Sequence, residues 1–141
     1  MLVRDCMTTG VRLGRPDMLV SEAARLMKEG DFGVLPVEKD DRLIGMITDR
    51  DIAIRCVANN SDLKTSKVAE VMTDKVFYCF EDQDIEEVAR NLGEKQIRRI
   101  PVVNREKRLV GILSLADLAL SDCRAETIER VVSDISQSQM Y

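Results

Sequence analysis

Two segments of this chain carry the same pattern, and this repeat constrains the fold more than any other feature. The first copy reads Leu35-Pro36-Val37 and continues, after a polar break, into Gly45-Met46-Ile47-Thr48-Asp49-Arg50-Asp51. The second reads Ile100-Pro101-Val102 and continues into Gly111-Ile112-Leu113-Ser114-Leu115-Ala116-Asp117. A repeated unit of this kind cannot bury its apolar face alone and needs its copy. The chain is therefore expected to fold as two similar, interdependent units.

The repeat extends beyond these two segments in the same order. Met7-Thr8 matches Met72-Thr73 at the spacing of 65 that separates Pro36 from Pro101. After the prolines the spacing becomes 66, as Gly45 and Gly111 show. One residue was gained or lost in the polar break, where a surface turn tolerates such a change.

Apolar periodicity predicts an amphipathic helix early in each unit. The positions follow an i, i+3, i+4, i+7 pattern, which is one face of a helix. They are Val20, Ala23, Ala24 and Met27 in the first unit and Ile85, Val88, Ala89 and Leu92 in the second. Asp17 and Asp82 are predicted N-caps, and Gly30 is a predicted end of the first helix.

Each proline segment is predicted to open a β-hairpin. Apolar runs at 34–37 and 43–47 flank a five-residue polar loop, and runs at 99–103 and 109–113 flank another. Proline lacks a backbone donor, so its strand is expected at a sheet edge or beside a break in the ladder. With a leading strand at 10–13 or 76–79 and a helix after each hairpin, each unit reads β-α-β-β-α.

The predicted organisation has four parts. Residues 1–60 form the first motif, 61–67 a polar linker, 68–122 the second motif, and 123–141 a C-terminal helix and tail. The helix is predicted from Ile128, Val131, Val132 and Ile135, and residues 137–141 are expected to fray.

Composition excludes several classes of function. The net charge of −4 disfavours non-specific binding to nucleic acid. The absence of histidine excludes Ser-His-Asp and Cys-His catalysis, and the four cysteines have no zinc-site spacing, so no metal site is predicted. They are expected to be buried or half-buried thiols, and Cys79 in particular is expected to be buried. No apolar run is long enough to cross a membrane and no signal peptide is evident, so a cytoplasmic location is expected.

The Gly-x-x-[Thr/Ser]-x-x-Asp pattern has two interpretations. Thr48 and Ser114 fall at the turn from strand to helix, where a hydroxyl can cap the helix, and Asp51 and Asp117 lie in its first turn. Alternatively, each carboxylate can accept two hydrogen bonds from the vicinal hydroxyls of a ribose. The residues alone permit both interpretations.

The order of these landmarks resembles the cystathionine β-synthase (CBS) domain, and the two copies resemble a CBS pair or Bateman module. The resemblance covers roughly residues 1–122 and extends to the small stand-alone CBS-pair proteins of bacteria and archaea. It implies an α+β fold, an α/β sandwich of two tandem motifs related by pseudo-two-fold symmetry. It also implies clefts between the motifs for AMP, ADP, ATP, S-adenosylmethionine or a NAD-type dinucleotide, in a regulatory protein without catalytic cofactor.

By the same resemblance, each cleft mixes residues of both motifs. Apolar members would sandwich the adenine, and Arg98 or Arg99 would bind phosphate. The Asp51 cleft is expected to use Met46, Thr48 and Asp51 with Val76, Ile97 and Arg98. The Asp117 cleft is expected to use Ile112, Ser114 and Asp117 with Val11, Gly33 and Val34. Because Arg98-Arg99 replaces Gly33-Val34 in the second unit, the two sites are expected to differ in affinity.

Family resemblance further implies a homodimer, a disc of four motifs, acting on a regulated protein that the sequence does not identify. An alternative is a protein-interaction module whose clefts are vestigial, with an interface of apolar helix positions that include Leu26, Met27, Ile54 and Leu118. An enzyme is the third hypothesis, but no nucleophile and base can be paired from the sequence. A thiol-based sensor is a minor fourth.

Overall fold

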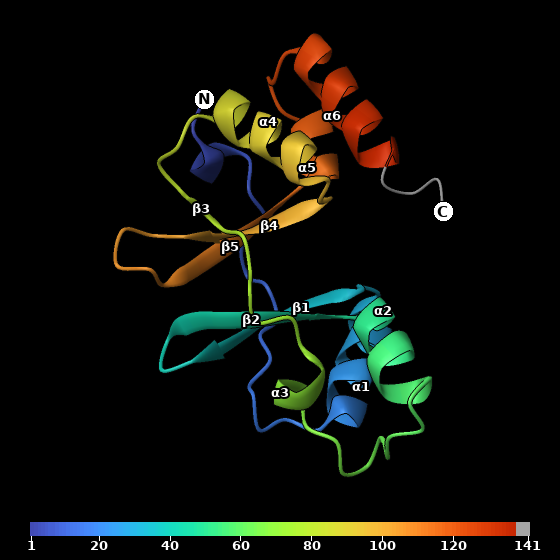
Figure 1. The fold of residues 1–141 in the computed structure, drawn as a ribbon. Helices are drawn as coiled ribbons and strands as arrows, with labels where there is room; N and C mark the ends of the chain where they lie inside the picture. The colour runs from blue at the N-terminus through green and yellow to red at the C-terminus, as the bar shows by residue number, and fades with distance from the viewer. Residues whose placement is uncertain (138–141) are drawn as a thin grey trace. The chain divides into compact units, whose positions relative to one another are not determined.

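The chain forms two compact units, each built from helices and small sheets (Figure 1), which confirms the predicted mixed fold class. The computed structural model describes residues 1–137, so the end of the predicted tail, 138–141, lies outside the described residues. The central unit comprises Arg12–Val76, and the terminal unit joins Met1–Val11 to Phe77–Tyr141.

In the central unit, the hairpin packs with α1 and the later helical segments around one core. Its elements are α1 (Val20–Gly30), β1 (Val34–Lys39), β2 (Arg42–Thr48), α2 (Asp49–Asp51), the π-helical η2 (Ile52–Val57) and α3 (Val68–Val71). The predicted helix face is buried at Val20, Ala23 and Met27, which join Leu35 and Ile47 in this core.

The hairpin of the central unit is tighter than predicted. β1 and β2 pair antiparallel, and only Asp40 and Asp41 separate them, with φ of 54° and 63°. Two consecutive residues at positive φ are the backbone of a type I′ turn, which matches the twist of the strands. The five-residue loop predicted at 38–42 is therefore wrong, because its flanking residues continue the ladder. The ladder shifts register between Val37 and Glu38.

Helix starts also differ from the sequence prediction, and neither Asp17 nor Asp82 is an N-cap. The helices begin at the first buried apolar residue of each face, so Leu19 and Asp84 precede them. Asp82 instead pairs with Arg105. The predicted end of α1 at Gly30 is confirmed, because Asp31 follows it in the left-handed conformation.

After β2 the chain forms one turn of α-helix and then widens into η2, where the amide of Ala58 donates to the carbonyl of Ala53. Such i to i+5 geometry is rare and often lies near functional sites. The predicted second helix is therefore present, with a π-helical second half.

The terminal unit contains a three-stranded sheet covered by helices. Its elements are η1 (Val3–Asp5), β3 (Cys79–Phe80), α4 (Ile85–Lys95), β4 (Arg99–Val103), β5 (Leu109–Ser114), α5 (Leu115–Ala119) and α6 (Ala125–Gln137). The strand order is β3-β4-β5, with β3 parallel to β4 and β5 antiparallel to it. The predicted five-residue loop between β4 and β5 and the predicted C-terminal helix are both confirmed.

The predicted leading strands are shorter than expected. Residues 10–13 form no strand, and only an isolated parallel bridge joins Gly14 to Val37. In the other unit the strand is limited to Cys79–Phe80, opposite Val102 and Val103. β3 therefore does not reach Pro101, and β1 belongs to a two-stranded sheet, so both prolines occupy positions where a missing donor is tolerated.

The two Met-Thr pairs are exchanged between the repeats. Thr8, from the start of the chain, forms an antiparallel bridge with Ile112, and Thr73 forms the matching bridge with Met46. The repeated glycines allow this approach, because a Cβ on Gly111 would lie 2.7 Å from the carbonyl oxygen of Thr8. A Cβ on Gly45 would lie 2.8 Å from that of Thr73. The compact units therefore divide the chain differently from the sequence motifs.

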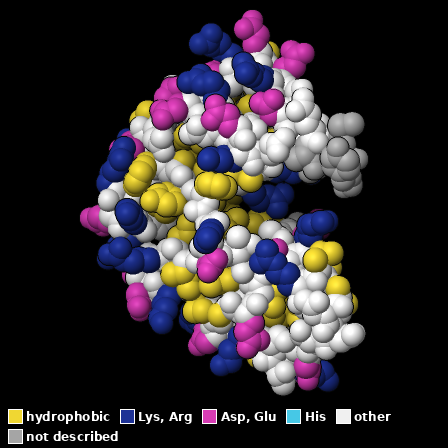
Figure 2. Space-filling view, in the orientation of Figure 1, with side chains coloured by type: hydrophobic (Ala, Val, Ile, Leu, Met, Phe, Trp, Pro, Cys, Tyr) yellow, Lys and Arg dark blue, Asp and Glu magenta, His cyan; other side chains and the backbone are white. Residues whose placement is uncertain are grey.

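Basic and acidic side chains are interspersed over the face shown in Figure 2. None of the helices in residues 1–137 combines the length and apolar character that crossing a membrane requires.

Candidate functional site

The turn from β2 to α2 holds Thr48 and Asp51 in a reciprocal capping box. The Thr48 hydroxyl oxygen accepts a hydrogen bond from the backbone N–H of Asp51 at 3.0 Å, and Asp51 Oδ2 accepts one from the N–H of Thr48 at 2.9 Å. This confirms the capping interpretation of the sequence motif. The box fixes the orientation of the carboxylate, whose second oxygen is not needed for capping.

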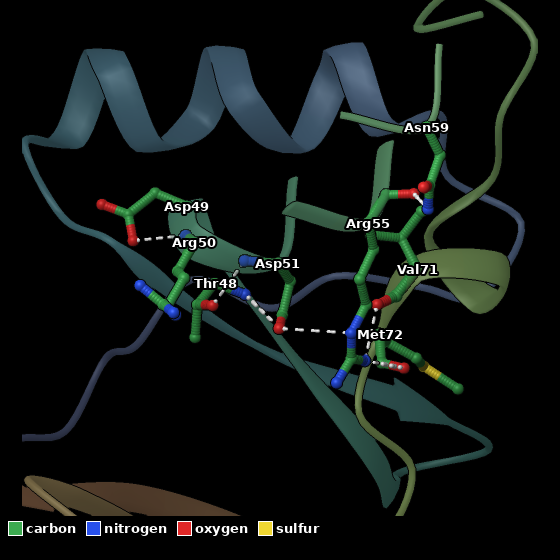
Figure 3. Close-up of polar contacts among 8 residues, drawn as sticks. All are labelled: Thr48, Asp49, Arg50, Asp51, Arg55, Asn59, Val71 and Met72. Atoms are coloured by element: carbon green, nitrogen blue, oxygen red, sulfur yellow. Dashed lines mark hydrogen bonds and ion pairs between the residues drawn. The ribbon is translucent and has the colours of Figure 1, made fainter. Parts of the chain in front are cut away.

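The second oxygen of Asp51 faces Arg55, as Figure 3 shows. Asp51 Oδ1 lies 3.9 Å from Arg55 Nε, which is an ion-pair distance but too long for a hydrogen bond. Arg55 is itself anchored, because its Nη1 donates to the carbonyl oxygens of Val71 at 3.1 Å and Met72 at 3.2 Å. The Asp51 side chain is only 15% exposed. The site thus combines a fixed, mostly covered carboxylate with an anchored cation.

The terminal unit repeats the capping box at the turn from β5 to α5. Ser114 Oγ accepts from the N–H of Asp117 at 3.1 Å, and Asp117 Oδ2 accepts from the N–H of Ser114 at 2.9 Å. Here the remaining oxygen has a different partner. The Thr8 hydroxyl donates to Asp117 Oδ1 at 3.1 Å, and its distance to Oδ2 is 3.3 Å.

Within each unit, the structure places other predicted ligand contacts beside these turns. In the central unit Val34 pairs with Thr48, and the carbonyl of Gly33 accepts from the N–H of Asp49. In the terminal unit Arg99 pairs with Ser114, and the carbonyl of Arg98 accepts from the N–H of Leu115.

Met46 and Ile112 are the strand residues that bridge to Thr73 and Thr8. The other predicted contacts, Val11, Val76 and Ile97, are partly buried. The assignment of these residues to two clefts stays a prediction.

Sequence reasoning missed the roles of Thr8 and Arg55. The repeated Met-Thr pair was visible as a landmark, but nothing in its spacing indicated that Thr8 would meet Asp117. Arg55 gave no repeat signal, because the corresponding position, 66 residues later, is Ser121. Its neighbours at the end of α3 are also distant in the sequence.

A small cavity of about 280 Å³ adjoins Asp117 in the terminal unit. It is lined by Met1, Asp5, Cys6, Asp117, Leu120, Ser121 and Asp122. This volume falls just below the usual range of sites for drug-sized ligands, which begins at about 300 Å³. A second hollow of about 300 Å³ lies between α4 and α6 and is lined mainly by charged side chains.

The thiols are poor candidates for chemistry. Cys56, Cys79 and Cys123 are buried and Cys6 is partly buried, and all four are free, so the predicted burial of Cys79 is confirmed. Burial raises the pKa of Cys79 to about 12. Burial, and then the negative charge of Asp117, raise the pKa of Cys6. Thiolate character, on which reactivity depends, is therefore suppressed at both positions.

Comparison with protein-family models identifies two matches to the CBS domain, at residues 3–57 and 68–121. The CBS domain-containing protein YhcV of Bacillus subtilis is 37% identical over 139 residues, which cover 99% of this chain and 98% of that protein.

Two solved structures are similar to this chain. Hypoxic Response Protein I, solved with two coordinated zinc ions, has a TM-score of 0.76 and 39% identity, covering 85% of this chain and 98% of that one. The CBS domain pair of protein MJ0100, solved with 5′-methylthioadenosine and S-adenosyl-L-methionine, has a TM-score of 0.74 and 28% identity, covering 85% and 94%. In the present chain, residues 1–137 contain no group of three or more His, Cys, Asp or Glu side chains placed to hold a metal.

Proposed function

This chain belongs to the CBS-domain family, and we propose that it is a regulatory module whose two capped carboxylates bind the ribose of adenosine-containing ligands. CBS pairs are typically regulatory, and MJ0100 was solved with two adenosyl compounds. The candidate ligands are AMP, ADP, ATP, S-adenosylmethionine and NAD. The proposal includes a non-enzymatic role and a cytoplasmic location.

The observation that carries the proposal is the state of the Asp51 carboxylate. Among residues 1–137, Oδ2 accepts a single hydrogen bond, from the backbone N–H of Thr48, and the one partner of Oδ1 is Arg55 at 3.9 Å. An ionised carboxylate offers about four lone-pair sites. Enough of them remain for the two hydroxyl donors of a ribose, and the capping box already fixes the carboxylate, so little ordering cost remains for the ligand.

The ligand is tested by the thermal stability of the purified protein with AMP, ADP, ATP, NAD and S-adenosylmethionine in turn. A ligand present at 100 times its Kd stabilises the folded state by about 2.7 kcal/mol, which a melting curve resolves. Failure of all five to shift the melting temperature at millimolar concentration contradicts the proposal.

The site is tested with matched substitutions of neighbouring carboxylates. Asp51→Asn keeps an oxygen that can cap Thr48 but removes the charge that attracts the diol, so it should weaken binding at least tenfold. Asp49→Asn is the control, because Asp49 is exposed and its Oδ1 accepts from the N–H of its own neighbour, Arg50. Equal losses in both variants would show that the effect is a general one of charge.

A second candidate function, dimerisation, is favoured by a pair of exposed apolar side chains. Ile54 is 52% exposed and Leu120 is 89% exposed, and they occupy corresponding positions in the two repeats. Met27 and Leu118, which the sequence suggested for an interface, are buried inside their own units and are unavailable. We propose that a second copy of the chain covers Ile54 and Leu120, giving a homodimer with four motifs.

Light scattering after size exclusion tests this candidate. The wild-type protein should have twice the chain mass, and Ile54→Glu with Leu120→Glu should reduce it to the chain mass. Leu63→Glu is the control, since Leu63 is also exposed but lies in the predicted linker. A monomeric wild type, or a double variant that still dimerises, would exclude this interface.

A further inference from the structure

The two repeated carboxylates, Asp51 and Asp117, differ in the hydrogen bonds that they already accept. Asp117 has hydrogen-bond donors on both oxygens, the Ser114 N–H on Oδ2 and the Thr8 hydroxyl on Oδ1. Asp51 has one donor from the part of the chain that the structure describes, the Thr48 N–H. Its other oxygen faces Arg55 at 3.9 Å, beyond hydrogen-bond distance. The sequence motif is the same in both places, so the difference comes from residues outside it.

Thr8 is held beside Asp117 by its own backbone. Its N–H donates to the carbonyl of Ile112 at 2.8 Å, and the N–H of Ile112 donates back to the carbonyl of Thr8 at 3.0 Å. Gly111 lets the Thr8 backbone lie against β5 without a clash. The Thr8 backbone is therefore fixed beside Asp117, and a side-chain rotation is enough for the hydroxyl to reach or leave the carboxylate.

The central unit has the same backbone arrangement without the same hydroxyl contact. Thr73 exchanges backbone hydrogen bonds with Met46 at 2.8 and 2.9 Å, just as Thr8 does with Ile112. Within residues 1–137, however, no hydrogen bond joins the Thr73 hydroxyl to Asp51. Arg55 is anchored on that side instead, by carbonyls at the end of α3. The chain thus has one capped carboxylate that accepts a hydrogen bond from a threonine hydroxyl, Asp117, and one that does not, Asp51.

We propose that Thr8 is an internal competitor for the ribose diol at Asp117, so that the Asp51 site fills first. The inference rests on the proposed function, since it assumes that the diol binds these carboxylates. A ligand at Asp117 must displace the Thr8 hydroxyl or share the carboxylate with it, whereas at Asp51 a ligand displaces no hydrogen bond that the residues 1–137 make to Oδ1. Displacing one hydrogen bond to a charged group corresponds to a difference of about tenfold in affinity for a partly solvated contact.

Isothermal titration with AMP and with S-adenosylmethionine tests this order. The wild-type protein should show a tight site that Asp51→Asn removes and Asp117→Asn leaves. Thr8→Val has the same shape without the hydroxyl, and it should tighten the weak site about tenfold. Thr73→Val is the matched control and should change neither site, while Thr8→Ser restores a hydroxyl and should restore the wild-type titration.

The outcomes separate the competitor from the underlying function. If Thr8→Val leaves both affinities unchanged, or if Asp117→Asn removes the tight site, the competitor is refuted although nucleotide binding stands. The competitor is also refuted if the two wild-type sites have equal affinities and each is lost on the Asp→Asn change of its own carboxylate. If neither ligand binds wild type or Thr8→Val, the ribose assignment itself is refuted, and the competitor with it.

Discussion

Replacing Gly111 with alanine tests the contact on which the exchanged segment depends. A Cβ at this position would lie 2.7 Å from the carbonyl oxygen of Thr8 and 2.9 Å from the sulfur of Met7. The sulfur belongs to a flexible side chain, but the carbonyl belongs to backbone that is paired with β5. The segment must therefore move away from the strand or the strand must distort.

The magnitude follows from the interactions at stake. Two backbone hydrogen bonds join Thr8 and Ile112, and each contributes about 1 kcal/mol net. Forcing a methyl group into packed surroundings costs about 1–3 kcal/mol when the neighbours stay in place. We expect Gly111→Ala to lower the free energy of unfolding by about 2–4 kcal/mol. For a chain of this length that is a fall of roughly 10 °C in melting temperature.

Hydrogen exchange locates the effect within the molecule. The amides of Thr8 and Ile112 should lose protection in Gly111→Ala, whereas those of Met46 and Thr73, which form the matching bridge, should keep theirs. Gly10→Ala is the control: its φ is +67° and a Cβ there meets nothing within 4 Å, so only a backbone cost of about 1 kcal/mol is expected. A loss in Gly111→Ala no larger than that in Gly10→Ala would refute the close-contact argument.

Three further predictions concern charge and thiols. Hydrogen bonding from Arg105 holds the pKa of Asp82 below its ordinary value, so this carboxylate stabilises the fold at neutral pH and the contribution is lost as the pH falls through the lowered pKa. In acid titrations followed by circular dichroism, Asp82→Asn should lose less stability than the wild type below about pH 4. The same pH dependence in both proteins would contradict this. Burial raises the pKa of Cys79 to about 12, so above the unfolded thiol pKa only the unfolded chain releases this proton and stability should fall as the pH rises toward 12. Urea unfolding between pH 9 and 11 should show a shallower fall in Cys79→Ala, and equal slopes would count against it. Arg55→Met should lower the urea midpoint by an amount equivalent to about 1 kcal/mol, because it keeps an apolar stem but removes the nitrogen that donates to two carbonyls at the end of α3; an unaltered midpoint would show that this anchor is dispensable.

The features that the sequence predicted correctly depend on neighbouring residues. The buried face of α1, the hairpins and the capping box of Thr48 and Asp51 all follow from patterns within short stretches of the sequence. Local rules were weaker at element ends. Asp17 has the chemistry of an N-cap, but burial of Val20 determined where the helix begins.

The rest of the site was not predictable because it depends on approaches between distant segments. Thr8 and Asp117 are 109 positions apart, and no alignment of one repeat on the other indicates that their side chains meet. A glycine within a strand indicates that another segment can approach closely, but only the structure shows that the segment at Gly111 is the one that carries Thr8. The contacts of Arg55 were not predictable for the same reason, since its partners lie 16 and 17 positions away at the end of a helix that the apolar periodicity did not indicate.

The exchange of the Met-Thr segments bears on how such a protein can arise from a shorter ancestor. A gene fragment that encodes only residues 1–60 would carry Thr8 but lack Ile112, and it would carry Met46 but lack Thr73. Two such fragments could still complete each other by exchanging their N-terminal Met-Thr segments, as separate molecules do in domain swapping. Fusing the two fragments into one chain would make this exchange intramolecular and independent of protein concentration. Tandem copies of this half would then be retained together, because losing either one leaves the other with an open strand edge.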